Sequence, residues 1–204
     1  MFTHINIINN NRVTLEEFKE QALGNLEMPK VLAKFYQFED EHLYFCRNFE
    51  ISIEEVSLDI EDEDNYYKTI KPFGYTNDGL TAFWVQNDDV ANSPIIYFSS
   101  DGEMRIIAKD FKNFMRILTF DVEVCNNMYK DKADYEESKD KQTYINWIKQ
   151  KFDLDPVCDL KTDERYGYSE DVITIIEDAE NLYKEKFIAW HKPFCDIEDI
   201  YNDF

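Results

Sequence analysis

The segment from Pro94 to Leu118 constrains the fold of this chain more than any other. Two β-rich runs, PIIYF and EMRIIA, lie on either side of a Ser-Ser-Asp-Gly sequence at residues 99–102, which favours a tight turn between antiparallel strands. Asp110 then stands where it can cap a helix. That helix would carry its apolar residues on one face: Phe111, Phe114, Met115 and Leu118. The segment predicts a β-hairpin followed by a helix that closes the sheet.

Further strands are expected before this hairpin. From His42 apolar and polar residues alternate over 43–45, 49–53 and 56–60, the pattern of half-buried antiparallel strands. The acidic run 61–64 is expected to be a solvated strand end or loop. The turn residues Asn77, Asp78 and Gly79 precede a strand at 82–86, which is apolar on both faces. Together these runs predict an antiparallel sheet of about five or six strands.

Helices are expected on both sides of this β region. Thr14 and Glu17 form a capping box, and Pro29 suits the first turn of a second helix. Beyond residue 120, helical patterns occur near 122–130, at 136–152 with Pro156 after it, and from Ser169 to Pro193. The predicted fold class is α+β, with an α+β domain at 1–120 and a helical C-terminal extension at 121–204 packed on the same globule.

The charge balance excludes several classes of partner. The chain has 43 Asp and Glu against 22 Lys and Arg, a formal net charge of −21. A nucleic-acid-binding surface needs clustered Lys and Arg, and an anionic membrane would repel this chain. An acidic field instead speeds encounter with a cationic partner, so a basic protein is the expected partner. The alternative is that the acidity serves solubility alone.

The cysteines and the N-terminal sequence bear on the compartment. Four widely spaced cysteines, Cys46, Cys125, Cys158 and Cys195, form no zinc-binding or disulfide pattern, and they are expected to be buried thiols in a reducing compartment. The N-terminal segment has no basic stretch followed by an apolar one, and no run of eighteen apolar residues occurs. The expected location is the cytoplasm, with no membrane span.

The motifs of common enzymes are absent from the sequence. There is no GxGxxG, GxxxxGK[ST], GxSxG or HExxH. His4, His42 and His191 lie in different segments without a second ligand at metal spacing. Acidic pairs such as Asp88 and Asp89 are expected to be solvated loop residues rather than Ca²⁺ ligands or an acid–base pair. The chain is therefore expected to be no enzyme and to have no catalytic residues, cofactor or metal.

The central segment resembles a known family. The order of features in GYTNDGLTAFWVQ and SPIIYFSSDGEMRIIAKDFKNFMRIL is similar to that of the SUKH superfamily, a group of cell-wall-synthesis regulators and bacterial immunity proteins. The resemblance covers about residues 14 to 120 and includes the Met28-Pro29 step before the second helix; residues 121–204 extend past the usual end. The other matching positions are Gly74, Asp78, Gly79, Trp84, Pro94, Ile96, Tyr97, Phe98, Gly102, Glu103, Ile107, Ala108, Phe111, Phe114 and Leu118.

The resemblance implies an α+β fold without catalysis, and a role in binding and neutralising a cognate polymorphic toxin, frequently a nuclease. A nuclease holds phosphates in a basic cleft, which an acidic protein can occupy. The predicted contact lies on the loops at one end of the sheet. Two interpretations of Trp84 stay open: it anchors an interface, or it is a core residue. The alternative function of the chain is a regulatory scaffold for a cell-wall or signalling protein. The predicted partner-binding residues are Asp62, Asp64, Tyr66, Asp78, Trp84, Asp88, Asp89, Asp101 and Glu103.

Overall fold

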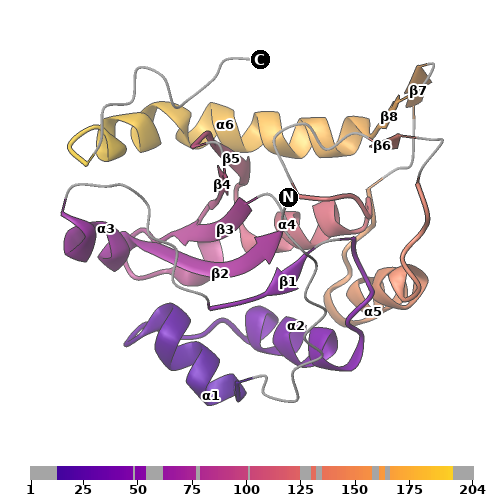
Figure 1. Cartoon of the computed structure of the whole chain (residues 1–204), viewed down its shortest axis with the longest axis horizontal. Helices are drawn as coiled ribbons and strands as arrows, with labels where there is room; N and C mark the ends of the chain where they lie inside the picture. The colour runs from indigo at the N-terminus through magenta and orange to yellow at the C-terminus, as the bar shows by residue number, and fades with distance from the viewer. Residues whose placement is uncertain are drawn as a thin grey trace.

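A five-stranded antiparallel meander forms the centre of the molecule (Figure 1). The computed structural model describes residues 13–47, 49–53, 62–76, 79–100, 102–124, 130–131, 135–157, 161–163 and 166–194. The strands follow one another in space in the order of the sequence, and each pairs antiparallel with the next. They are β1 (Glu50–Ile51), β2 (Ile70–Thr76), β3 (Gly79–Trp84), β4 (Ile95–Ser99) and β5 (Met104–Ala108).

Both faces of this sheet are buried, and alternate residues of β3 show how. Leu80, Ala82 and Trp84 belong to one apolar cluster, whereas Phe83 belongs to the other. Successive side chains of a strand point to opposite faces, so a strand buried on both sides must be apolar at every position. The expectation of a strand apolar on both faces is met by β3 except at Thr81, whose buried hydroxyl donates to the carbonyl of Gly74 at 3.1 Å.

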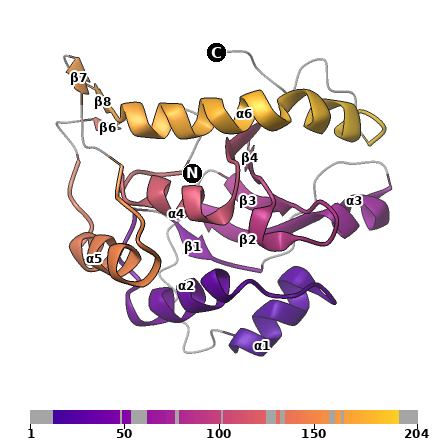
Figure 2. The ribbon, with the colours of Figure 1, turned by 180° about the vertical axis from the view of Figure 1, so that it is seen from behind.

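Helix α6 (Glu170–His191) covers the first of these faces. Figures 1 and 2 show it lying across the sheet, on the side away from α1 and α2. Its Ala179 and Phe187 share a core cluster with Leu80, Trp84 and Ile96 of the sheet. Ser169 begins the helix by accepting a hydrogen bond from the backbone N–H of Val172 at 3.4 Å. Arg105 of β5 and Glu180 of α6 form an ion pair at 2.9 Å.

The opposite face is covered by helices from both halves of the chain. The N-terminal pair consists of α1 (Leu15–Phe18), continued by the π-helical turn η1 (Lys19–Leu23), and α2 (Lys30–Glu41). With them pack α4 (Phe111–Leu118) and α5 (Lys141–Phe152). One core cluster contains Phe35 of α2, Phe111 of α4, Tyr144 of α5 and Val172 of α6. Residues from 1–120 and from 121–204 therefore share a single core.

The remaining elements are short. Helix α3 (Glu63–Thr69) precedes β2, and the 3-10 turn η2 (Val90–Asn92) lies between β3 and β4. A second, three-stranded sheet has the order β6-β8-β7, with β6 at Lys130–Asp131, β7 at Lys161–Asp163 and β8 at Tyr166–Tyr168. None of the helices in the described ranges has both the length and the apolar composition needed to cross a bilayer.

The fold class and the local helix signals are confirmed. The protein is α+β, with a five-stranded antiparallel sheet and helices on it. The capping box of Thr14 and Glu17 is present, with the backbone N–H of Thr14 donating to Glu17 at 2.7 Å. Asp110 caps α4 by accepting from the backbone N–H of Asn113 at 2.8 Å. These signals are local in sequence, which is why the residues alone reveal them.

Several strand predictions are wrong. Residues 43–47 form turns and bends rather than a strand, and only Glu50–Ile51 of the run 49–53 pairs in the sheet. The expected run at 56–60 lies outside the described residues. Glu63 and Asp64 lie in α3 rather than in a strand end or loop. Asp62 lies in an exposed turn, as expected, and occupies the N-cap of α3. Its left-handed backbone, with a φ of 56°, turns the chain into that helix.

The helices expected after residue 120 are partly corrected. Residues 122–124 are not helical, 125–129 lie outside the described part, and Lys130–Asp131 pair as β6. Helix α5 begins at Lys141 rather than at 136, because residues 135–138 instead contact Asp121. It ends at Phe152, where Asp153 takes a left-handed conformation with a φ of 53°, three residues before Pro156. The small second sheet was not predicted at all.

Candidate functional site

Asp88 and Asp89 follow β3 in a tight turn. The backbone N–H of Asp89 donates to the carbonyl of Gln86 at 3.0 Å, and the two central residues, Asn87 and Asp88, have φ values of 52° and 59°. Positive φ at both central positions is typical of a type I′ turn, and Asn and Asp tolerate this conformation better than most residues. The turn therefore holds Asp88 in a fixed, outward position.

The two carboxylates differ in what they do. Asp89 accepts from the backbone N–H of Asn92 at 3.3 Å and from the side-chain amide of Asn92 at 2.8 Å, so it caps η2. Asp88 is exposed, and no hydrogen bond or ion pair within the described ranges engages its carboxylate. Of the two acidic residues, Asp88 is the one whose charge is available to a partner.

Asp62 lies at the same end of the sheet. Helix α3 leads directly into β2, and the backbone N–H of Val85 donates to the carbonyl of Thr69 at 2.8 Å, which joins the end of α3 to the end of β3. Asp62 is exposed at the start of α3 and accepts a hydrogen bond from the side-chain amide of Asn65. The side chain of Asp64 lies outside the described part of the molecule.

The prediction that all these loops lie at one end of the sheet is wrong. Gly79 pairs with Ser99, whereas Trp84 pairs with Ile70. The β2–β3 turn and the β4–β5 turn are therefore together at one end, and Asp88 is at the other. The six residues of β3 separate them by about 20 Å of strand. Glu103 is half-buried at the far end; Asp78 and Asp101 lie outside the described residues.

Tyr66 and Trp84 are core residues, so the prediction that they contact a partner needs correction. Tyr66 is 0% and Trp84 is 2% exposed. The ring of Trp84 contacts Phe187 at a centroid distance of 5.1 Å, and the ring of Tyr66 contacts Trp190 at 5.2 Å. Helix α6 covers both of them. The burial of Trp84 supports its interpretation as a core residue rather than as an interface anchor.

Acidic residues are also concentrated on the outer face of α6. Glu177, Asp178 and Glu185 are exposed there, together with Leu182, which is 52% exposed. The C-terminal end of this helix packs on α3 through Trp190 and Tyr66. This end carries Lys184, Lys186 and Lys192 beside Glu185, so most acidic residues of α6 lie in its first half, away from α3. No ion pair in the described part of the chain involves Asp62, Asp88 or Asp89.

A groove lies on the opposite side of the molecule, between α2 and α5. Its volume is about 530 Å³, within the range of ligand-binding clefts in proteins. The rings of Phe38 and Trp147 stack in it at a centroid distance of 4.4 Å and an interplanar angle of 27°. Around these rings lie polar side chains that can donate and accept hydrogen bonds: Gln37, Thr143, Asn146 and Gln150.

Two exposed apolar side chains directly follow the C-cap residue of α2, which lines this groove. Leu43 is 58% and Tyr44 is 62% exposed, and both follow His42, which lines the groove. The carbonyl of Tyr44 accepts a hydrogen bond from the backbone N–H of Asp140 at 2.9 Å. The loop after α2 is thereby attached to the start of α5.

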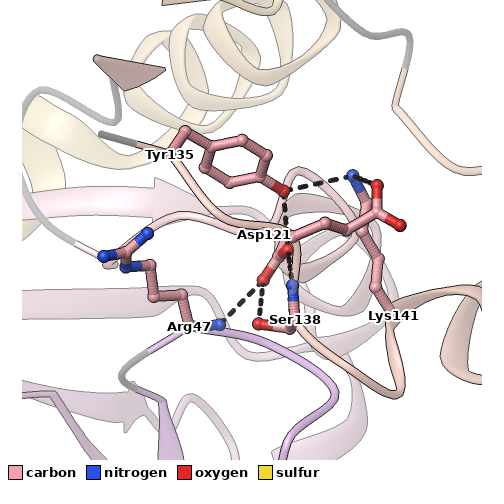
Figure 3. A network of polar contacts seen from close by, with 6 residues as sticks. Arg47, Asp121, Tyr135, Ser138 and Lys141 are labelled. Carbon is pink, nitrogen blue, oxygen red and sulfur yellow. Dashed lines mark hydrogen bonds and ion pairs between the residues drawn. The ribbon is translucent and has the colours of Figure 1, made fainter. Parts of the chain in front are cut away.

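A buried carboxylate holds the same region together (Figure 3). Asp121 is 0% exposed. It accepts hydrogen bonds from the backbone N–H of Arg47 at 2.9 Å, from the hydroxyl of Tyr135 at 2.6 Å, and from the backbone N–H and hydroxyl of Ser138 at 2.7 and 2.6 Å. The nearby Lys141 forms an ion pair with Glu137 at 3.4 Å. One side chain therefore positions both the loop after α2 and the segment before α5.

Sequence reasoning missed this region, although one signal was present. Leu43, Tyr44 and Phe45 are consecutive large apolar residues, and a strand with one buried face cannot bury all three. In the structure only Phe45 is buried. Trp147 lies three residues after Tyr144 on α5, a spacing that places both on neighbouring turns of the helix. That Trp147 lines a groove could not be read from this segment, because the other wall is α2, which is distant in sequence.

The described residues contain no cluster of three or more histidine, cysteine, aspartate or glutamate side chains placed to hold a metal ion. Cys46 is a buried thiol whose sulfur lies 3.8 Å from the carbonyl oxygen of Val122; the other three cysteines lie outside the described ranges. Burial lowers the pKa of His191 to about 4, and neither of its ring nitrogens has a hydrogen-bond partner in the described structure. Its position in the core is unsuited to contact a large substrate.

A scan against protein-family models, a search of curated proteins and a search of solved structures each return no match to this chain. The resemblance to the SUKH superfamily therefore stays a prediction that depends on the residues quoted for it.

Proposed function

We propose that the chain is a non-catalytic cytoplasmic protein that binds and neutralises a basic partner protein, in the manner of an immunity protein acting on its cognate toxin. The observation that carries this proposal is the exposed pair Asp62 and Asp88 at one end of the sheet, on a chain of net charge −21. The field of these charges attracts a cationic surface over several ångströms and speeds docking.

A nuclease is the toxin class that this chemistry suits best. Its active cleft carries positive charge because it must hold phosphates. A protein that places carboxylates in the mouth of that cleft excludes the nucleic acid without taking part in the reaction. The rigid turn that carries Asp88 favours this role, because a group that is already fixed loses little conformational entropy on binding.

The test measures binding of the chain to the purified product of a neighbouring toxin-like reading frame, together with inhibition of that protein's nuclease activity. A variant with Asp62→Lys and Asp88→Lys should associate about tenfold more slowly at low salt, with a weaker dependence on ionic strength. The control is Glu16→Lys with Glu20→Lys, exposed positions on α1 and η1, which changes the net charge by the same amount. We expect the control to retain most of the association rate.

Two outcomes would contradict the proposal in different ways. Equal slowing by both double variants would mean that net charge alone acts, and that this end of the sheet is no binding site. Tight binding without any inhibition of the toxin would instead favour the regulatory scaffold.

A further inference from the structure

We infer that the groove between α2 and α5 is a docking site for a single amphipathic helix of a partner protein, whose last turn carries carboxylates. This site lies on the side of the sheet away from α6, and the inference does not depend on the acidic surface proposed above. It rests on the shape, the exposed apolar groups and the charge distribution of the groove.

The two helices that form the groove run antiparallel. At one end the ammonium group of Lys34 lies 5.7 Å from the centre of the Phe152 ring. In the middle Phe38 stacks on Trp147, and at the other end Tyr44 bonds to Asp140. Each helix has 12 residues, which corresponds to about 18 Å, or three turns. A third helix of similar length fits along such a groove.

The apolar groups of the groove suit the apolar face of a helix. Trp147 is only half-buried between the helices. Outside the lining itself, Leu43 and Tyr44 directly follow the groove residue His42 and are the most exposed large apolar side chains in the described part of the chain. Trp and Tyr are the residue types that contribute most to protein interfaces.

The groove is also held in shape without an occupant. Asp121 binds the backbone at Arg47 and at Ser138, and these residues flank the loop after α2 and the start of α5. Its own backbone has a φ of 58°, a left-handed conformation that aspartate tolerates better than most residues. A preorganised groove loses less entropy when it binds.

Charge decides which way the occupant lies. Lys34 and Lys151 are at one end of the groove, and Glu41 is at the other. A helix carries partial negative charge at its C-terminus and partial positive charge at its N-terminus. The occupant therefore places its C-terminal turn, with its carboxylates, against the two lysines. In this orientation it runs parallel to α5 and antiparallel to α2.

The test uses hydrocarbon-stapled peptides, because a free peptide of about twelve residues is barely helical in water. The first carries leucines on one face and glutamates in its last turn. The second has the same composition with the glutamates in its first turn, and the third is scrambled. Fluorescence anisotropy with the full chain should give a Kd about tenfold lower for the first peptide than for either of the others.

Matched variants of the chain locate the binding. Asn146→Glu places a carboxylate beside Trp147 and should weaken binding of the first peptide about tenfold. The control is Asn181→Glu, because Asn181 is also an exposed helical asparagine but lies on α6; it should leave the Kd unchanged. Lys34→Glu with Lys151→Glu leaves carboxylates at both ends of the groove and should remove the preference for the first peptide over the second.

Three results would overturn the inference. The first is equal binding of the three peptides, and the second is no binding of any of them. The third is a concentration-dependent dimer, seen by sedimentation velocity and abolished by Asn146→Glu, which would assign the groove to a second copy of the chain. The Asp62→Lys and Asp88→Lys variant should bind the first peptide normally, so failure here is distinct from failure of the proposed toxin contact.

Discussion

At the scale of single residues, the side chain of Asp121 connects segments that are far apart in the sequence. It joins segments that are 74 and 17 positions away in the sequence, through Arg47 and Ser138. Because it is fully buried, each of its lone pairs must be satisfied by the protein. A chain that lacks this carboxylate leaves four donors without their acceptor.

Replacing Asp121 by Asn should therefore destabilise the protein by about 2 to 4 kcal/mol, because an amide nitrogen cannot accept from the donors that face it. Asparagine tolerates a φ near 58°, so the backbone is not disturbed. Urea unfolding provides the measurement. Tyr135→Phe is the control, since it removes one donor and should cost about 1 kcal/mol. Equal effects of the two substitutions would mean that Asp121 is not the main support of this region.

His191 makes stability depend on pH in the acidic range. It ends α6 and is fully buried. A helix C-terminus favours a cation, but burial has the larger effect and lowers the pKa from 6.5 to about 4. The unfolded chain then binds the proton more readily than the folded chain. The neutral ring of His191 contributes fully to the free energy of unfolding above pH 6.5, and this contribution is lost as the pH falls toward 4.

His191→Phe should remove this part of the pH dependence, because phenylalanine keeps an aromatic ring in the core and binds no proton. The free energy of unfolding at pH 7 and at pH 4.5, from urea titrations of both proteins, gives the measurement. We expect the wild-type chain to lose about 2 kcal/mol more than the variant over this interval. An equal loss in both would show that His191 is accessible to water in the folded state.

At the scale of elements, the β3–β4 hairpin depends on a glycine. A Cβ atom at Gly79 would clash with the backbone carbonyl oxygen of Phe98 and lie 2.6 Å from the hydroxyl of Tyr97. At Gly74 it would lie 2.6 Å from the ring of Phe49 and 2.8 Å from the hydroxyl of Thr81, which are side-chain atoms rather than backbone atoms. The two glycines thus differ in how rigid their neighbours are.

Gly79→Ala should accordingly cost more stability than Gly74→Ala, by at least about 1 kcal/mol, since only the first substitution requires a strand backbone to shift. Thermal unfolding followed by circular dichroism measures both. Gly102, where a Cβ would meet nothing within 4 Å, serves as a reference for the effect of a positive φ alone. A larger effect at Gly74 would contradict the register of β3 against β4.

How far the sequence predicts an element depends on how local its causes are. The capping box at Thr14, the cap at Asp110 and the hairpin of β4 and β5 were predicted correctly, because the residues that cause them lie within a few positions of one another. The region 42–47 was predicted as a strand from its alternation, but Asp121 holds it from a distance of 74 residues.

The candidate site follows the same rule. The exposure of Asp62 and Asp88 was predictable from their charge. The end of the sheet at which each turn lies depends on the pairing of Gly79 with Ser99. These residues belong to different segments, so neither segment alone reveals it. The burial of Trp84 depends on α6, about a hundred residues away. The groove requires α2 and α5 to meet, which neither of their sequences indicates.

At the scale of the whole molecule, α6 completes the core. The sheet face that it covers includes Trp84, Ile96, Phe98 and Ile106, all of them at most 3% exposed. Without α6 these side chains would form an apolar patch much larger than a stable monomer tolerates. Residues 1–120 resemble a known domain. Because they lack the helix that covers this face of the sheet, we expect them to be incomplete as a folding unit.

A fragment of residues 1–168 should therefore aggregate or bind a hydrophobic dye, and should unfold without a cooperative transition. Adding a synthetic peptide of residues 169–194 should restore the blue-shifted fluorescence of buried tryptophan, which provides a positive control for a competent fragment. A soluble fragment with a sharp thermal transition of its own would show that the sheet needs no second cover. Circular dichroism and dye fluorescence measure both outcomes.

The position of α6 late in the chain also affects biosynthesis. While the ribosome is still adding the residues that precede Ser169, the emerging polypeptide already holds every strand of the central meander but nothing to shield one side of it. Strands with open apolar sides are the species that associate wrongly during translation. We therefore expect the nascent chain to need protection from association, for example by chaperones, until α6 has left the exit tunnel.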